Sequence, residues 1–250
     1  MRSNCRRHII LILAALGCLG SPATSFPIVS GHWDAGPVIV IDPGHGGYDN
    51  GASEKSGEIR EKDVSLNLAR ILSQSLSPDF QVILTRTGDY QLDILERTAT
   101  ANHFRGKLFI SLHAGGSFQH QAGGISIWHY ASPTNVPFRT NSGTKLPETV
   151  KNRKIPWRDI QTIHAASSRR FARLLHARLT ETALITPVRI HSGPLPVLEG
   201  ADMPAVLIET GYISRPADLL ILQHADGLSG LTDAIARAVK DFFLKNQAQK

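Results

Sequence analysis

Three β-prone apolar runs of this chain each end in a histidine or a glutamate that is followed at once by small residues. These junctions lie at Ile41–Asp49 (Ile-Asp-Pro-Gly-His-Gly-Gly-Tyr-Asp), Ser111–Ala114 (Ser-Leu-His-Ala) and Leu207–Gly211 (Leu-Ile-Glu-Thr-Gly). In parallel α/β sheets, the side chains that carry the chemistry stand at the carboxyl ends of the strands. Three such ends in one chain therefore predict a sheet whose carboxyl edge holds a functional site.

Apolar residues recur with two alternating periods along the chain. Runs typical of strands cover Val38–Asp42, Gln81–Thr85, Leu108–Leu112, Gly124–His129, Pro187–His191 and Ala205–Glu209. Segments between them carry apolar residues at helical spacing, for example Val64, Leu68, Leu72 and Leu76. This alternation predicts an α/β fold in which helices cover a mostly parallel sheet.

The first 25 residues have the pattern of an export signal. Three arginines precede the apolar stretch Ile9–Gly20, which is too short to span a bilayer comfortably. We expect cleavage after Ser25, which would leave residues 26–250 as the mature chain in the periplasm or outside the cell. The alternatives are a buried amino-terminal helix and attachment of a lipid at Cys18, although the residues before Cys18 fit the usual lipobox poorly.

The composition of the expected mature chain limits its chemistry. Both cysteines, Cys5 and Cys18, lie in the signal, so that any metal would be held by histidines and carboxylates. The formal net charge falls from +6 to +3 because three arginines leave with the signal. Such a mildly basic surface suits an anionic envelope polymer and gives no reason to expect nucleic acid as a partner.

The remaining residues, about 225, are enough for one domain with a large core and too few for a comfortable two. They contain no second apolar stretch long enough for a membrane span. One stretch, Ala131–Pro156, shows neither period and contains four prolines. Long connections of this kind are surface loops, lids or partner-binding segments, so both a simple loop and a lid stay open here.

Four residues are candidates for the functional site. Taken singly, His45 would be a loop histidine, His113 a core histidine, and Glu61 a first-turn acid that the helix dipole favours. Glu209 differs, because it closes the apolar run Ala205–Ile208 of a predicted central strand. A carboxylate is costly to bury there without a partner, which favours a role in metal binding or proton transfer.

Two histidines and one glutamate would leave a zinc ion with one open coordination position, as in catalytic zinc sites. A further carboxylate would then carry the proton of the attacking water to the leaving amine. The chain contains no H-E-x-x-H, no Gly-x-Ser-x-Gly elbow and no Gly-x-x-x-x-Gly-Lys-Ser/Thr loop. The glycines around His45 also lack the last glycine of the dinucleotide fingerprint, so nucleotide binding is not expected.

Six short segments carry a resemblance to a known enzyme family. They are Val40–Gly47, Arg60–Asp63, Leu84–Arg86, Leu95–Arg97, Phe109–Ala114 and Pro204–Ser214. In this order they resemble the zinc-dependent N-acetylmuramoyl-L-alanine amidases of the cell-wall autolysin type. The resemblance covers nearly all of the mature chain and implies a three-layer αβα sandwich with a six-stranded sheet.

The resemblance also implies the roles of the candidate residues. His45, Glu61 and His113 would ligate one zinc ion, and Glu209 would be the catalytic carboxylate. The substrate would be peptidoglycan, cleaved at the amide bond between the lactyl group of N-acetylmuramic acid and the L-alanine of the stem peptide. The chain has no separate wall-binding repeat, so recognition would come from the catalytic domain or from a partner, such as a protein activator.

The chain departs from the family pattern at two positions near the site. Gly115 stands where the family usually has asparagine, and Arg215 replaces the asparagine of Ser-Asn-Pro. Neither change removes a proposed ligand or the carboxylate, so they bear on substrate preference more than on activity. Two other functions stay open, a zinc peptidase or deacetylase on the same ligands and a wall-binding module without turnover. A module without turnover would have no physical reason to keep a buried glutamate.

Overall fold

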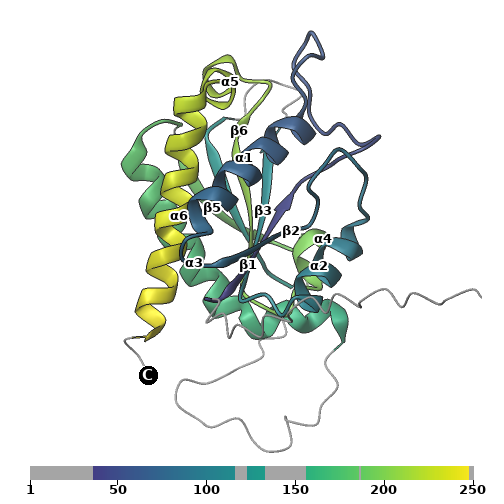
Figure 1. Cartoon of the computed structure of the whole chain (residues 1–250), viewed down its shortest axis with the longest axis vertical. Coiled ribbons are helices and arrows are strands. Elements are labelled where there is room, and N and C mark those ends of the chain that lie inside the picture. The colour runs from purple at the N-terminus through teal and green to yellow at the C-terminus, as the bar shows by residue number, and fades with distance from the viewer. Residues whose placement is uncertain (1–35, 116–122, 133–155, 186, 248–250) are drawn as a thin grey trace, which may run out of the picture. The chain divides into compact units, whose positions relative to one another are not determined.

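A computed structural model of the chain describes residues 36–115, 123–132, 156–185 and 187–247 (Figure 1). The export signal expected at residues 1–25, with the cleavage site, lies outside the described residues, as does most of the loop Ala131–Pro156. None of the helices in the described ranges is long and apolar enough to cross a membrane.

A six-stranded sheet forms the centre of the fold, with strand order β2-β1-β3-β6-β4-β5. The strands are β1 (Val38–Pro43), β2 (Gln81–Leu84), β3 (Leu108–Gly115), β4 (Ile125–Tyr130), β5 (Val188–Gly193) and β6 (Ala205–Tyr212). All six predicted strands are therefore present, and the prediction of a mostly parallel sheet is confirmed. The exception is β4, which pairs antiparallel with β6 and parallel with β5, so that the β4–β5 pair runs against the other four strands.

Helices cover both faces of this sheet, as the three-layer prediction requires. They are α1 (Glu61–Leu76), α2 (Ile94–His103), α3 (Ile160–Thr182), α4 (Pro196–Glu199), α5 (Pro216–Gln223) and α6 (Ala225–Gln247), with a 3-10 turn at Trp157–Asp159. In Figure 1, α1 and α6 run side by side along one face, where α6 also packs on α3. The shorter α2 and α4 pack together on the opposite face.

Alternation along the strands divides the side chains between the two faces. Ile39, Ile41, Ile110 and Ile208 join the large core under α1, α3 and α6. Their neighbours belong to a smaller core on the other face, formed with α4 by Val40, Phe109, Leu198, Met203 and Leu207. This second face carries Asp42, Ser111, His113 and Glu209 toward the carboxyl ends of β1, β3 and β6, because each lies two or four residues beyond a core residue of the same strand.

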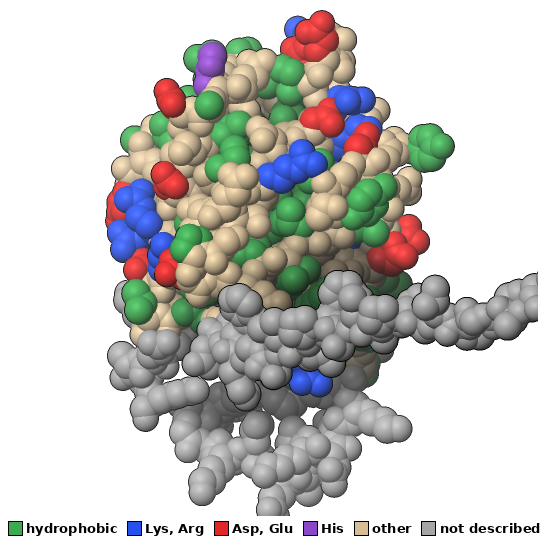
Figure 2. Space-filling view, viewed as in Figure 1, with side chains coloured by type: hydrophobic (Ala, Val, Ile, Leu, Met, Phe, Trp, Pro, Cys, Tyr) green, Lys and Arg blue, Asp and Glu red, His purple; other side chains and the backbone are tan. Residues whose placement is uncertain are grey.

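One face of the described residues carries side chains of both charges. On the face shown in Figure 2, acidic and basic side chains alternate with apolar ones and do not form a wide patch of a single sign.

Candidate active site

The turn after β1 places His45 at the carboxyl edge of the sheet. His45 has φ 62°, and Gly46 and Gly47 that follow it also have positive φ values, so the chain turns sharply here. The ring of His113 lies against Gly44, so there is no room for a side chain at this position. A Cβ atom at Gly44 would be 2.4 Å from Cε1 of His113. The β1 turn and the end of β3 are therefore packed directly on each other.

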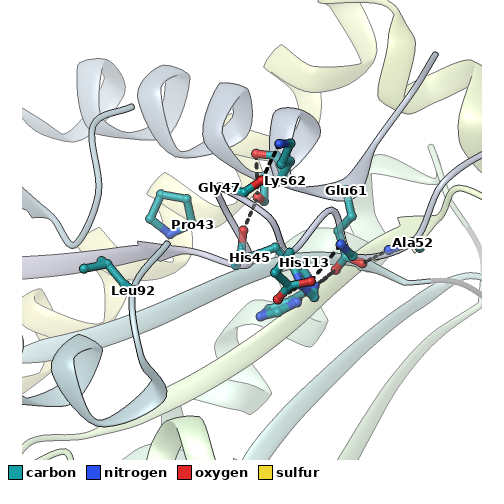
Figure 3. A network of polar contacts seen from close by, with 12 residues as sticks. Pro43, His45, Gly47, Ala52, Glu61, Lys62, Leu92 and His113 are labelled. Atoms are coloured by element: carbon teal, nitrogen blue, oxygen red, sulfur yellow. Dashed lines mark hydrogen bonds and ion pairs between the residues drawn. The ribbon is translucent and has the colours of Figure 1, made fainter. Parts of the chain in front are cut away.

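Glu61, the first residue of α1, joins the two histidines (Figure 3). Its Oε1 lies 3.1 Å from Nε2 of His45 and 2.9 Å from Nδ1 of His113. Its carboxylate also accepts backbone hydrogen bonds from Ala114 at 3.1 Å and from Ala52 at 2.8 Å. These four contacts hold the carboxylate in one orientation between the two rings.

The structure thus brings together three residues that are far apart in the sequence. The rings of His45 and His113 meet edge to face with centroids 4.9 Å apart. One ligand atom from each of His45, Glu61 and His113 lies within 4.8 Å of the other two, so this cluster could hold a metal ion. Two imidazoles and a buried carboxylate, with no thiolate, form a donor set that suits zinc among the divalent metals.

The contacts within the cluster lower the pKa of Glu61 and raise that of His45. Burial opposes ionisation of Glu61, but the hydrogen bonds to His113 and His45 hold its pKa well below the ordinary value. Burial likewise lowers the pKa of His45, and this is more than offset by Glu61 and Asp49, so that the pKa of His45 is raised. Glu61 is therefore an anion over the whole neutral range, as a metal ligand must be.

Asp49 is a site residue that the sequence analysis missed. Its Oδ2 lies 2.8 Å from Nδ1 of His45, and its Oδ1 accepts the backbone N–H of Gly51 at 3.0 Å. The ring is thereby oriented with its other nitrogen, Nε2, toward Glu61. Metal-binding histidines typically use a carboxylate in this way. An acid four residues after His45 in the same glycine-rich loop was the available signal.

Glu209 lies beside this cluster on the neighbouring strand. It is directly opposite His113 in the parallel register of β3 and β6. Its Oε2 is buried and has no hydrogen-bond partner among the described residues. Burial is the largest cause that raises the pKa of this carboxyl above its ordinary value. An orphaned buried carboxylate oxygen is costly, which indicates that it serves a bound group rather than the fold.

A buried ion pair between Asp42 and Arg97 helps to hold the β1 turn in place. Asp42 accepts hydrogen bonds from Thr85 at 2.5 Å, Ser111 at 2.8 Å and Arg97 at 2.8 Å. Arg97 also donates to the carbonyl oxygen of His45 at 3.0 Å. The backbone of a candidate ligand is thus connected to a network that includes β1, β3, α2 and Thr85, the residue that follows β2.

Arg86 makes a second buried connection. Its guanidinium donates to the carbonyl oxygens of Pro43 at 3.0 Å, Gly44 at 2.7 Å and Lys62 at 2.8 Å. Arg86 therefore ties the β1 turn to the first turn of α1, where Glu61 lies. Arg86 and Arg97 belong to segments that carried the family resemblance, but the sequence assigned them no role, because nothing in it shows which carbonyl groups a buried arginine will meet.

Comparison with known proteins agrees with this architecture. The family model Amidase_3, described as N-acetylmuramoyl-L-alanine amidase, matches residues 39–241. The chain belongs to this family. All four candidate residues, His45, Glu61, His113 and Glu209, fall within the part that matches the amidase family.

Individual members of the amidase family show how far the likeness extends. AmiC of Escherichia coli is 28% identical over 220 residues, which cover 82% of this chain and 52% of AmiC, so the chain spans about half the length of that relative. AmiA of the same species is 28% identical over 231 residues, covering 82% of this chain and 76% of AmiA. The solved catalytic domain of CwlV from Paenibacillus polymyxa superposes with a TM-score of 0.66 at 25% identity, covering 83% of this chain and 98% of that domain.

Proposed function

We propose that this chain is an exported, zinc-dependent amidase that hydrolyses the bond between N-acetylmuramic acid and the L-alanine of the peptidoglycan stem peptide. The observation that carries the proposal is the convergence of His45, Glu61 and His113 beside the unpartnered oxygen of Glu209. Membership of the amidase family supports the choice of this amide bond among the bonds of the wall.

His45, Glu61 and His113 would hold the zinc ion, one per chain. When bound, zinc supplies a water of pKa roughly 7 and polarises the substrate carbonyl. Asp49 keeps the His45 ring in place through Nδ1, and the backbone groups of Ala52 and Ala114 keep the Glu61 carboxylate in place. These contacts preorganise the three donors before substrate arrives.

Glu209 would be the catalytic carboxylate. It would take a proton from the attacking water and return it to the nitrogen of the L-alanine as the amide bond breaks. Its raised pKa, caused chiefly by burial, makes it a stronger base than an exposed glutamate. Its free Oε2 has no competing hydrogen bond from the described residues to give up first.

Export and regulation belong to the same proposal. Residues 1–25 would be removed as a signal peptide, and residues 26–250 would act on the wall in the periplasm or outside the cell. Lipid attachment at Cys18 stays the alternative. The lid at Ala131–Pro156 and the protein activator stay predictions.

Digestion of purified peptidoglycan tests the reaction. We expect the zinc-loaded mature protein to release stem peptides that begin with L-alanine and to leave glycan strands with unsubstituted lactyl groups, as read by mass spectrometry. Cuts within the stem would instead identify a peptidase, loss of acetyl groups a deacetylase, and sedimentation with the wall without new products a binding module. Any of these three results would contradict the proposal.

Metal analysis tests the ligand set separately. The purified protein should contain close to one zinc per chain, and His113→Ala should lose most of it, because one of three protein donors is missing. The matched control is His164→Ala, which removes a histidine that pairs with Asp202 away from the cluster. Undiminished zinc in His113→Ala would remove this residue from the metal site.

A further inference from the structure

A groove of about 540 Å³ runs over β4 and β5 on the same face of the sheet as the candidate active site. Its lining includes Ser126 and Trp128 of β4, Arg189 and His191 of β5, and Arg215 from the turn after β6. The alternation of side chains along β4 explains the position of the groove. The apolar residues Ile125 and Ile127 of β4 point into the large core, so the alternate residues Ser126 and Trp128 point to the other face.

Strand register connects the groove to Glu209, because Ser126 of its lining lies opposite Glu209. Strand register places His113 opposite Glu209, Glu209 opposite Ser126, and Ser126 opposite Arg189. These four residues therefore form one row across β3, β6, β4 and β5, with all four side chains on the same face. Neighbouring strands lie roughly 4.8 Å apart, so the Cα of Arg189 is about 10 Å from that of Glu209.

The groove has a basic lining and a planar wall. Arg189 is exposed, and its guanidinium donates a hydrogen bond to the carbonyl oxygen of Gly123 at 3.3 Å. Arg215 adds a second guanidinium, which is paired with the buried carboxylate of Asp218, and none of the eight described residues that line the groove is acidic. The rings of Trp128 and His191 stack with centroids 4.6 Å apart, which gives the wall a planar surface.

A buried aspartate connects three parts of the groove. Asp218, which is 2% exposed, accepts hydrogen bonds from the backbone of Gly124 at 2.9 Å and of Tyr212 at 3.1 Å, and from the side chain of Arg215 at 3.0 Å. One carboxylate thus joins the start of β4, the end of β6 and a guanidinium of the lining. A preformed basic site loses less entropy when it binds an anion.

We propose that this groove is a subsite for the stem peptide, in which Arg189 binds a free carboxylate on the second residue of the stem. The proposal rests on the proposed function, since the scissile amide must lie at Glu209 for the spacing to apply. From that amide, two extended residues span about 7 Å, and the arginine side chain covers the remaining distance to Arg189. The planar wall of Trp128 and His191 would pack against the peptide backbone.

A matched pair of soluble muropeptides tests the subsite. The two carry the second stem residue with its α-carboxylate free or converted to a carboxamide. For the zinc-loaded mature protein we expect kcat/KM to be about tenfold higher on the carboxylate form, mainly through KM, because a guanidinium–carboxylate contact is charge-assisted. Arg189→Gln should lower kcat/KM about tenfold on the carboxylate form and leave the carboxamide form within twofold. The control Lys107→Gln removes a positive charge at the opposite end of β3 and should keep the preference.

A binding measurement separates this inference from the amidase reaction. Calorimetry on the Glu209→Gln variant, with and without Arg189→Gln, should show the same tenfold preference for the carboxylate form without any cleavage. Preference retained in the absence of Arg189, or Arg189-dependent binding of the disaccharide without its peptide, would overturn the subsite. Intact binding preference combined with no cleavage by the wild-type protein would overturn the amidase reaction and leave the groove as a binding site.

Discussion

The two faces of the sheet differ in how completely helices cover them. On one face, α1, α3 and α6 have 16, 23 and 23 residues, and the side chains beneath them form a continuous apolar core. On the other, α2 and α4 have only 10 and 4 residues. The helices therefore cover the second face less completely, and His113, Glu209 and the groove lined by Arg189 lie on this face.

The covered face mainly stabilises the fold, whereas the partly covered face carries the groups of the candidate site. Full apolar cover removes side chains from water and stabilises the fold, whereas polar groups at a partly covered edge cost stability when they are buried without partners. Glu209, with its unpartnered oxygen, is the clearest example of the second kind. Substitutions on the two faces should consequently change different observables.

The largest effect is expected from Glu209→Gln, which keeps the shape of the side chain but cannot accept the proton. Positioned acid and base groups contribute roughly 10²–10⁴ in rate, so turnover on peptidoglycan should fall by about that factor. Zinc content and wall binding should persist, because Glu209 is outside the cluster of three ligands. Loss of zinc in this variant would make Glu209 a ligand, and unchanged turnover would end its role as the base.

Arg97→Met should affect both stability and the candidate site, because Arg97 contacts both Asp42 and the carbonyl oxygen of His45. Loss of Arg97 leaves the Asp42 carboxylate buried without a counter-charge, which costs about 3–5 kcal/mol in the free energy of unfolding. Zinc affinity should also fall, because the backbone carbonyl of His45 loses the donor that helps to fix the β1 turn.

The double variant Asp42→Asn/Arg97→Met separates these two consequences. It removes both buried charges, so denaturant unfolding should show that much of the lost stability returns. Competition with a chelator should show that zinc affinity does not return, because His45 still lacks the contact. Recovery of both would mean that Arg97 acts only through the charge of Asp42.

Leu175→Ala tests the covered face alone. Leu175 of α3 is buried in the large core, and its truncation should lower the free energy of unfolding by about 2–5 kcal/mol, as measured in urea. Turnover per folded molecule and zinc content should match the wild type, because α3 contributes no side chain to the three-residue cluster. A change in zinc affinity would show that the two faces are coupled.

The smallest effect concerns pH and stability. The carboxyl of Glu209 has a pKa raised above its ordinary 4.5, so the folded state holds this proton more tightly than the unfolded chain does. Metal-free wild-type protein should therefore lose stability as pH rises from 4.5 through the raised pKa. Glu209→Gln has no such proton, and its stability relative to wild type should grow over the same interval. A difference that stays constant with pH would contradict the burial of this group.

Much of the site could be predicted because its signals are local. His45, His113 and Glu209 each end a β-prone run, and Glu61 opens an amphipathic helix, so a parallel arrangement was enough to suggest that they meet. The structure brings the proposed ligands within 4.8 Å of one another and places Glu209 opposite His113. Asp49 was missed because an acid in a loop has many ordinary explanations.

The sequence by itself determined the local conformations, since strand and helix periods, glycines at sharp turns and the residues at strand ends act over a few neighbours. Only the tertiary structure decided which strands pair, that β4 and β5 run against the others, and that Arg86 and Arg97 meet the carbonyl groups of the β1 turn. These contacts join residues separated by tens of positions along the chain. Their partners depend on the register and direction of every strand between them, which periodicity in one segment does not encode.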